Sequence, residues 1–301
     1  MQGTRLIAAA GALSLVLSVP ALADQGPRSR PEPLTMGAPA VSLTPYRGLA
    51  AWVDMYDGKP WEAPSATVKD MAARGTKTLF VETGNYKKRT DIYKRRSLGR
   101  MLDTAHEKGM QVVAWYVPSF TNNVRDFRRI KKAINFTSPG GERFDSFAMD
   151  IEATVATSIT ARNRRMLALS DRVRKLVGPA YALGAITPDP VTQRYWPGFP
   201  YQGVAARYDA FLPMAYWTYR TRGESRVYRY VSDAIAYIRR AAGHGDPIHI
   251  IGGIASDAST REVRGFARAA RAHNAIGASL YDYPITSARQ WKQMRRLNVV
   301  D

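Results

Sequence analysis

The chain has 301 residues, no cysteine and a formal net charge of +19, with 44 lysines and arginines against 25 acidic residues. The absence of cysteine excludes disulfides, thiolate metal sites, a cysteine nucleophile and a lipoprotein anchor. The positive charges fall on predicted helical faces, as in the run Arg261, Arg264, Arg268 and Arg271, and they form no nucleic-acid recognition motif. We therefore expect solvated outer helices, or electrostatic attraction to an anionic cell wall, and no nucleic-acid partner.

The first 45 residues predict export. Residues 1–23 combine Arg5, an apolar run over Leu6–Val19 and the sequence Ala21-Leu22-Ala23, a pattern typical of a signal peptide with its cleavage site. The apolar run is short and interrupted, so we expect no stable membrane span. Residues 24–45 are rich in proline, show no periodicity and predict a disordered linker. We expect a secreted protein, either extracellular or associated with the cell wall.

Residues 46–301 predict a single α/β domain, a (β/α)8 TIM barrel. Eight short apolar segments alternate with amphipathic helical segments, and this order indicates parallel strands joined by right-handed crossovers. The predicted strands are Leu49–Tyr56, Thr78–Glu82, Gln111–Val117, Ser146–Glu152, Ala180–Thr187, Ala210–Trp217, Ile248–Ile254 and Ala278–Asp282. The predicted helices are Ala66–Arg74, Arg95–Lys108, Val124–Phe136, Ser158–Val177, Gly223–Ala242, Thr260–Ala272 and Thr286–Leu297. The irregular connection between strands five and six has room for a short helix only.

The fourth predicted strand carries the most informative pattern. Alternate side chains of a strand project to opposite sides, so Phe147, Met149 and Ile151 share one face while Asp150 and Glu152 share the other. Two carboxylates held this close cannot both ionise freely, so the pKa of one rises and an acid survives at neutral pH. This pattern favours an inner barrel strand that ends in an active site. The structural alternative is a buried ion pair with an arginine of a neighbouring strand.

Acids and aromatic residues dominate the predicted C-terminal strand ends, where (β/α)8 barrels carry their active sites. Besides strand four, these ends supply candidate substrate-binding residues: Asp54, Glu82, Tyr116, Asp189, Trp217 and Asp282, with Tyr216 beside Trp217. The loop after strand five adds Tyr195, Trp196, Phe199 and Tyr201, which predict either an exposed aromatic platform or a cover packed on helices. Gly252 and Gly253 would leave space for a substrate. Aromatic faces stack on sugar rings and carboxylates supply acid–base chemistry, so the rim favours carbohydrate.

Other chemistries fit less well. No lysine ends a predicted strand, which argues against a Schiff-base aldolase. The four histidines form no His-x-His metal motif, and we expect each of them to be structural or solvated: His106, His244, His249 and His273. We expect no metal and no cofactor.

The segment from Asp145 to Glu152 resembles the strand-four motif of glycoside hydrolase family 18, the chitinase-like family, which reads Asp-Gly-x-Asp-x-Asp-x-Glu. Asp145, Asp150 and Glu152 match, whereas Ser146 replaces the glycine and Ala148 the first inner aspartate. Met214-Ala215-Tyr216 is similar to the strand-six Met-x-Tyr of that family, although Trp217 replaces its usual Asp or Asn.

A second, partial resemblance is to glycoside hydrolase family 25, the lysozyme-like muramidases. That family places acids at the ends of strands one, four and eight, and Asp54, Asp150, Glu152 and Asp282 are similar to this set. Both resemblances imply a barrel hydrolase that acts on sugars such as N-acetylhexosamines.

We therefore predict a glycosidase that acts on a polysaccharide or a peptidoglycan-type glycan, with Glu152 as general acid and Asp150 beside it. The family 18 resemblance implies that Asp150 and Tyr216 orient an acetamido nucleophile, and the family 25 resemblance gives Asp54 and Asp282 electrostatic roles. The substrate-binding set is Asp54, Glu82, Tyr116, Asp189, Trp196, Trp217 and Asp282. A catalytically silent, lectin-like barrel is the alternative, since Ala148 and Trp217 stand where family 18 has polar groups.

Overall fold

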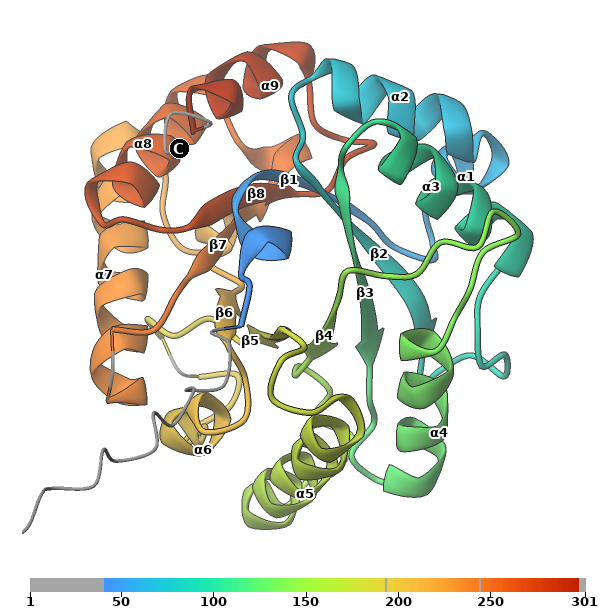
Figure 1. The fold of residues 1–301 in the computed structure, drawn as a ribbon. Helices are drawn as coiled ribbons and strands as arrows, with labels where there is room; N and C mark the ends of the chain where they lie inside the picture. The colour runs from blue at the N-terminus through green and yellow to red at the C-terminus, as the bar shows by residue number, and fades with distance from the viewer. Residues whose placement is uncertain (1–40, 193, 244, 298–301) are drawn as a thin grey trace, which may run out of the picture. The chain divides into compact units, whose positions relative to one another are not determined.

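The structure is a computed structural model that describes residues 41–192, 194–243 and 245–297. Within these residues, eight parallel strands form one sheet in the order β6-β5-β4-β3-β2-β1-β8-β7, and helices surround it (Figure 1). Parallel bridges Phe211–Ile248 and Met214–Ile251 join β6 to β7 and bring the two edges of the sheet together. The predicted (β/α)8 barrel is confirmed. The predicted signal peptide and residues 24–40 of the predicted linker lie outside the described residues.

The strands are β1 (Gly48–Val53), β2 (Thr78–Asn85), β3 (Gln111–Val117), β4 (Ser146–Asp150), β5 (Leu183–Thr187), β6 (Ala210–Pro213), β7 (His249–Ile254) and β8 (Gly277–Tyr281). The helices of the described residues are α1 (Gly58–Glu62), α2 (Pro64–Ala73), α3 (Arg95–Glu107), α4 (Asn123–Ile134), α5 (Ile159–Val177), α6 (Tyr201–Ala205), α7 (Glu224–Ala242), α8 (Thr260–Ala272) and α9 (Ala288–Met294). In the same part of the chain, the short 3-10 helices η1 to η4 cover Thr44–Tyr46, Trp217–Tyr219, Ala255–Asp257 and Arg295–Leu297. The short α6 lies between β5 and β6, where the sequence predicted at most a short helix.

Four predicted strands extend too far at their C-terminal ends, those of β1, β4, β6 and, by one residue, β8, because the last residues turn out of the sheet. After β1 the carboxylate of Asp54 accepts hydrogen bonds from the backbone N–H groups of Tyr56 and Asp57, which fold the chain into a turn. Ile151 and Glu152 likewise form a turn after β4, and Trp217 begins η2 after β6. The predicted linker is also too long, since Thr44–Tyr46 is helical and Pro45 is buried.

The barrel interior is filled by aliphatic side chains of alternate strand residues together with a few large aromatic rings. Tyr46 lies deep in the interior, where its hydroxyl is 2.6 Å from Ser146 Oγ and donates to the carbonyl of Phe147 at 3.0 Å. Trp52 stacks on Phe80 at 4.3 Å and donates its indole N–H to Ser279 Oγ. Among the described residues, the middle of the barrel is thus a packed core, as is usual for this architecture.

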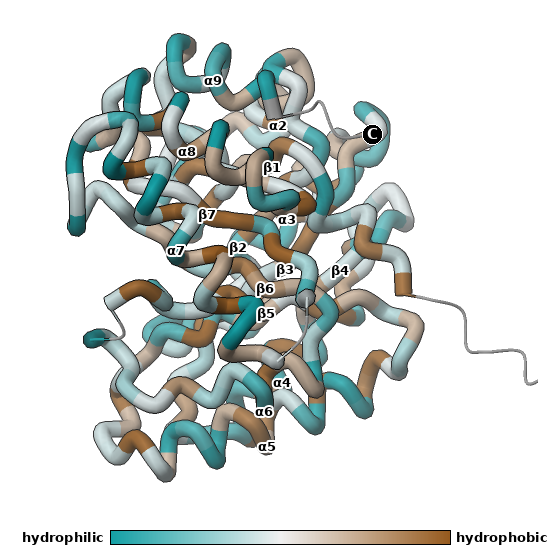
Figure 2. The backbone as a smooth tube through the Cα atoms, turned by 90° about the vertical axis from the view of Figure 1, so that its left-hand side faces the viewer, coloured by the Kyte–Doolittle hydropathy of each residue, from teal (hydrophilic) through white to brown (hydrophobic). Residues whose placement is uncertain are grey.

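A second apolar layer lies between the outer face of the sheet and the helices. Figure 2 shows brown, hydrophobic segments along strands such as β7 and teal, hydrophilic segments on helices such as α9. Side-chain caps fix several helix starts, including reciprocal capping boxes at Ser259–Glu262 and Ser287–Gln290. Among the described residues, we find no helix with the length and hydrophobicity needed to cross a membrane.

Candidate active site

Asp150 is the last residue of β4 and points into the barrel. Phe147 and Met149 pack outward against the helices, whereas Ala148 belongs to the inner cluster, and this alternation turns Asp150 inward. Its residue surface is only 7% exposed, and its Oδ1 has no hydrogen-bond partner. Burial raises the pKa of Asp150 well above its usual range, and the charges of Glu152 and Glu82 raise it further. Burial and these neighbouring charges therefore both favour the protonated form of Asp150.

Glu152 follows β4 by two residues and lines a pocket of about 210 Å³ at the barrel rim. The residues around the pocket are Glu152, Pro188, Asp189, Tyr195, Met214, Tyr216, Tyr219 and Arg220. Burial raises the pKa of Glu152, while the positive charge of Lys87 opposes the rise. A carboxyl that faces a pocket and holds its proton above the usual pH range suits general acid catalysis.

Tyrosines form most of the apolar lining of this pocket. Burial raises the pKa of the Tyr216 hydroxyl, and the nearby charges of Asp150 and Glu152 raise it further, so this group stays a hydrogen-bond donor. Its ring lies 6.3 Å from that of Tyr219, which is 62% exposed, and Tyr195 is 51% exposed. The pocket thus presents exposed aromatic rings beside an acid whose pKa is raised, a combination that fits a sugar.

Asp189 lies in the same pocket and is paired with a cation. Its Oδ2 accepts a hydrogen bond from Arg220 Nε at 3.0 Å and from the hydroxyl of Thr192 at 3.2 Å. The predicted substrate-binding position of Asp189 is thus at the pocket wall, where Arg220 adds a positive charge that the sequence did not indicate.

A second acidic cluster lies beside β1 and β8. Carboxylate oxygens of Asp54, Asp57 and Asp282 lie within 4.8 Å of one another. Burial and the charges of its neighbours raise the pKa of Asp282 to about 8, and the same causes raise the pKa of Asp57 to about 6. Oxygen ligands of this kind suit Ca²⁺ or Mg²⁺. Because Asp54 already accepts bonds from Tyr281 and from backbone N–H groups, we assign no cation to the cluster.

Glu82 lies between the two acidic groups. It is 1% exposed, and its oxygens accept bonds from Met55 N at 2.9 Å and Asn85 Nδ2 at 3.0 Å. Burial raises the pKa of Glu82 to about 8, to which the charges of Asp54 and Glu152 contribute. Its carboxyl therefore holds the loop after β1 in place and does not face the pocket, which corrects the predicted substrate-binding role.

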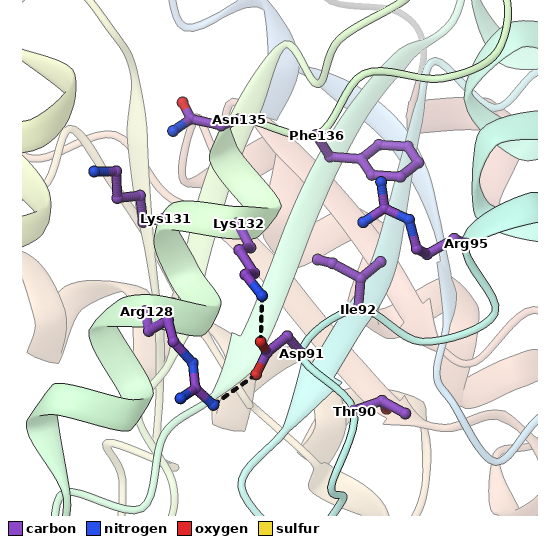
Figure 3. A pocket seen from close by; sticks show the side chains of 9 residues that line it. All are labelled: Thr90, Asp91, Ile92, Arg95, Arg128, Lys131, Lys132, Asn135 and Phe136. Atoms are coloured by element: carbon purple, nitrogen blue, oxygen red, sulfur yellow. Dashed lines mark hydrogen bonds and ion pairs between the residues drawn. The ribbon is translucent and has the colours of Figure 1, made fainter.

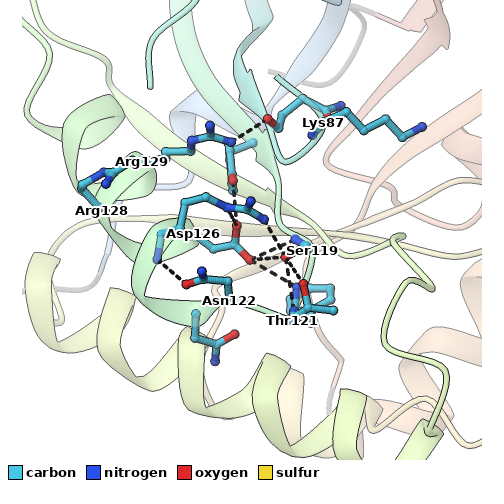
Figure 4. A network of polar contacts seen from close by, with 12 residues as sticks. Lys87, Ser119, Thr121, Asn122, Asp126, Arg128 and Arg129 are labelled. Atoms are coloured by element: carbon cyan, nitrogen blue, oxygen red, sulfur yellow. Dashed lines mark hydrogen bonds and ion pairs between the residues drawn. The ribbon is translucent and has the colours of Figure 1, made fainter. Parts of the chain in front are cut away.

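Tyr116 also has a structural role. Its ring points outward from β3, is 1% exposed and donates its hydroxyl proton to Asp126 at 2.8 Å. Figure 4 shows the surrounding network, in which Asp126 accepts further bonds from Ser119 while Arg129 reaches toward the loop of Lys87. Arg129 Nη1 donates to the carbonyl of Asn85 at 2.8 Å, so the network anchors the loop that carries the charge opposite Glu152.

The predicted roles of Trp217 and Trp196 in substrate binding are wrong, because both indoles are buried. Trp217 is 0% exposed and packs on Phe266, with ring centroids 5.1 Å apart. A Cβ added to Gly252 would lie 2.7 Å from the Trp217 ring. The two adjacent glycines thus leave space for this tryptophan and not, as predicted, for a substrate.

Trp196 is 1% exposed and packs beneath the loop after β5. Its N–H donates to Asn163 Oδ1 at 2.7 Å, and the guanidinium of Arg162 lies 4.0 Å from its ring centroid. Phe199 and Tyr201 are buried as well, so the cover interpretation holds for these three aromatics. Only Tyr195 of the four is exposed and reaches the pocket.

Trp115 is an inner residue that lies outside the predicted substrate-binding set. It lies directly opposite Ala148 in the β3–β4 register and edge-on to Trp52 at 5.8 Å. Its indole nitrogen is buried without a hydrogen-bond partner. Period-two alternation carried from Val113 would have placed Trp115, and not Tyr116, on the inner face.

The remaining motif residues lie away from the pocket. Asp145 precedes β4, where its Oδ2 accepts a bond from Val112 N at 2.7 Å and lies 2.9 Å from His106 Nε2. His249 is buried neutral inside the barrel, and burial lowers its pKa to about 4. Both observations agree with structural histidines, and His244 lies outside the described residues.

No family model matches the chain, and no curated protein matches its sequence. Solved structures do share its architecture. The endo-beta-1,4-mannanase from Thermotoga petrophila aligns with a TM-score of 0.65 at 10% identity, over 84% of this chain and 76% of that chain. The spore cortex-lytic enzyme SleL from Bacillus cereus gives 0.61 at 9% identity, over 84% and 74%.

A plant class V chitinase mutant from Cycas revoluta, in complex with (GlcNAc)3, gives a TM-score of 0.61 at 11% identity, over 83% of this chain and 99% of that chain. The expected resemblance to chitinase-like barrels is therefore supported by the fold. At these identities the likeness shows the (β/α)8 fold alone.

Proposed function

We propose that the protein is a secreted glycoside hydrolase that acts on a polysaccharide or cell-wall glycan, with Glu152 as its general acid. The observation that carries this proposal is the position of Glu152. Its carboxyl lines a tyrosine-rich pocket at the barrel rim, burial raises its pKa, and the buried Asp150 lies behind it. The fold shared with a mannanase, a chitinase and a cortex-lytic enzyme supports a glycan as substrate.

In the proposed reaction, Glu152 donates its proton to the leaving glycosidic oxygen and later takes a proton from the attacking water. Proton transfer by a positioned carboxyl accelerates such reactions by about 10²–10⁴-fold. Asp150 lies buried behind Glu152, and its charge would help to keep the proton on the pair of carboxyls. With an N-acetylated sugar, Asp150 and the Tyr216 hydroxyl would orient the acetamido group as the nucleophile.

A glycan-binding protein without hydrolytic activity is the second candidate, and Ala148 favours it. Family 18 enzymes carry an inner aspartate at this position, whereas here Ala148 lies against Trp115 inside the barrel. The proposed hydrolase must therefore work with Asp150 and Glu152 alone on strand four.

Release of reducing ends from chitin, mannan, peptidoglycan and an acidic polysaccharide separates the two candidates. Each polymer is incubated with the protein while binding is measured in parallel by co-sedimentation. We expect reducing ends to accumulate with at least one polymer. Binding without any release would favour the lectin-like protein and contradict the proposed hydrolase.

Secretion rests on the sequence pattern at the N-terminus. Cleavage after Ala23 would give a mature chain that starts at Asp24. N-terminal sequencing of the protein recovered from the culture medium checks this, and an intact Met1 in a cell-bound protein would contradict it.

A further inference from the structure

A larger pocket, of about 670 Å³, lies on the outer wall of the barrel between α4, the start of α3 and the connection that joins β2 to α3. Its lining residues are Thr90, Asp91, Ile92, Arg95, Arg128, Lys131, Lys132, Asn135 and Phe136 (Figure 3). Four of these residues are cations and one is an anion. The pocket is separate from the one that Glu152 lines.

Asp91 is the only carboxylate of this lining, and two of the cations neutralise it. Its Oδ1 accepts from Arg128 at 2.9 Å and its Oδ2 from Lys132 at 2.6 Å, with the buried Arg129 3.4 Å away. These partners lower the pKa of Asp91 to about 2, so it stays ionised at any physiological pH. Its negative charge is already shared among three cations.

The two remaining cations have no carboxylate partner among the described ion pairs. The guanidinium of Arg95 lies 5.1 Å from the ring centroid of Phe136, across the pocket from Arg128 (Figure 3). Lys131 is exposed on α4. Stacking on an aromatic ring limits the freedom of a guanidinium without using its N–H donors, which leaves Arg95 prepared for an oxyanion.

We propose that this pocket binds the anionic groups, carboxylate or phosphate, of a glycan polymer. The β2–α3 connection that supplies Thr90 and Asp91 also carries Lys87, whose charge acts on Glu152, and Lys88, which lies 4.9 Å from the Tyr56 ring. Basic residues therefore run along one connection from the barrel rim to the pocket. A polymer bound at the rim can extend along this connection to the pocket. The choice of a glycan as this polymer rests on the proposed function.

The test compares two variants that each remove two positive charges. Arg95→Ala/Lys131→Ala changes the pocket, and Arg229→Ala/Arg240→Ala removes two exposed arginines of α7 that make no described ion pair. Binding is measured at low and high salt with polygalacturonate, which carries carboxylates, with polyglycerol phosphate and with neutral mannan. We expect the pocket variant to bind at least one anionic polymer about 10-fold or more weakly than wild type, as loss of a charged hydrogen bond predicts. The polymer that loses more affinity identifies the anion.

Equal loss in both variants would show that only net charge matters and would overturn the proposal, as would unchanged binding in the pocket variant. Binding to duplex DNA is measured as well. If the pocket variant lost more affinity for duplex DNA than for the anionic polymers, the proposal would be overturned in favour of nucleic acid. Reducing-end release is measured for the same proteins on a short neutral oligosaccharide. We expect the pocket variant to retain that activity, and absence of activity in wild type would contradict the proposed hydrolase without affecting the binding result.

Discussion

Ala148 and Trp115 face each other across β4 and β3, and this pair explains where the strand-four sequence departs from the chitinase-like motif. Ala148 is fully buried in the inner cluster, and the small methyl group leaves room for the indole of Trp115. In the same row of the sheet, Glu82 of β2 lies opposite Trp115, and the next inner residue of β4 after Ala148 is Asp150. An aspartate at position 148 would bury a further carboxyl where the Trp115 ring now packs, with that indole N–H as the nearest unpartnered donor.

Ala148→Asp should therefore lower the free energy of unfolding by about 3 kcal/mol or more, because a further carboxyl is buried in the space that the Trp115 ring occupies. Urea denaturation of the single variants and of Ala148→Asp/Trp115→Ala measures the coupling between the two positions. We expect the double variant to be more stable than the sum of the single changes predicts. A wild-type free energy of unfolding for Ala148→Asp would show that this account of the pair is wrong.

The sequence predicted the inner position of Asp150 because period two holds along a paired strand, whereas Glu152 lies in the turn after β4. It failed for Trp217 because the prediction extended the strand past Pro213, where the chain leaves the sheet and alternation no longer applies. It failed for Trp196 because burial beneath a loop depends on Phe120 and Arg162, which come from other elements. Tyr219, in the 3-10 helix η2, and Arg220, the residue after it, also line the pocket. No helix or strand periodicity of the sequence could have placed them there.

At the scale of elements, His106 connects α3 to the start of β4. Its Nε2 lies 2.9 Å from Asp145 Oδ2, its Nδ1 lies 2.5 Å from Glu142 Oε2, and Asp145 also accepts the N–H of Val112 on β3. The hydrogen bond to Asp145, together with Glu142, raises the pKa of His106 to about 9 against the opposing effect of burial. Asp145, the residue that matches the start of the family 18 motif, thus connects α3, β3 and the start of β4.

We expect His106→Gln to lower the free energy of unfolding by about 1–2 kcal/mol below about pH 6.5, where the histidine is charged in both folded and unfolded chains. Because the folded pKa is the higher one, this stabilisation is lost as the pH rises through about 9. Thermal unfolding of both proteins across this range measures the difference, with His273→Gln as the control. A difference that stays constant up to high pH would contradict the ion pairs.

At the scale of the whole molecule, the barrel rim is acidic although the chain carries a net charge of +19. The pKa values of Glu82 and Asp282 rise to about 8, chiefly through burial, and the pKa of Asp57 rises to about 6. The folded protein consequently holds protons at the rim that the unfolded chain has lost. Raising the pH should therefore destabilise the rim before it affects the rest of the barrel.

Glu82→Gln tests, at one buried position, whether protons held at the rim make stability fall as the pH rises. The folded pKa of Glu82 is about 8 and the ordinary value is 4.5, so between these limits its contribution to stability falls with rising pH by up to about 1.4 kcal/mol per unit. A neutral glutamine removes that slope. We expect the variant to gain stability relative to wild type as the pH rises from 5 to 8, whereas other groups such as His249 titrate in both proteins. Parallel stability curves would contradict the raised pKa of Glu82.

The architecture of the molecule was predictable because eight alternating units of strand and helix leave few arrangements other than a barrel. The strand ends were less predictable, since the rim loops are shaped by hydrogen bonds such as those of Asp54, which no local pattern reports. The basic pocket was also beyond sequence reasoning. Arg95 and Lys131 are far apart in the chain, and only the packing of α4 beside the start of α3 brings them to the same pocket.

Glu152→Gln tests the central claim most directly. On the polymer that wild type cleaves, the variant should release reducing ends about 10²–10⁴-fold more slowly, because an amide cannot donate the proton that the leaving oxygen requires. Glu107→Gln, an exposed position on α3, serves as the matched control and should cleave at the wild-type rate, with all three proteins unfolding at similar temperatures. Cleavage by Glu152→Gln at the wild-type rate would contradict the assignment of Glu152 as the general acid.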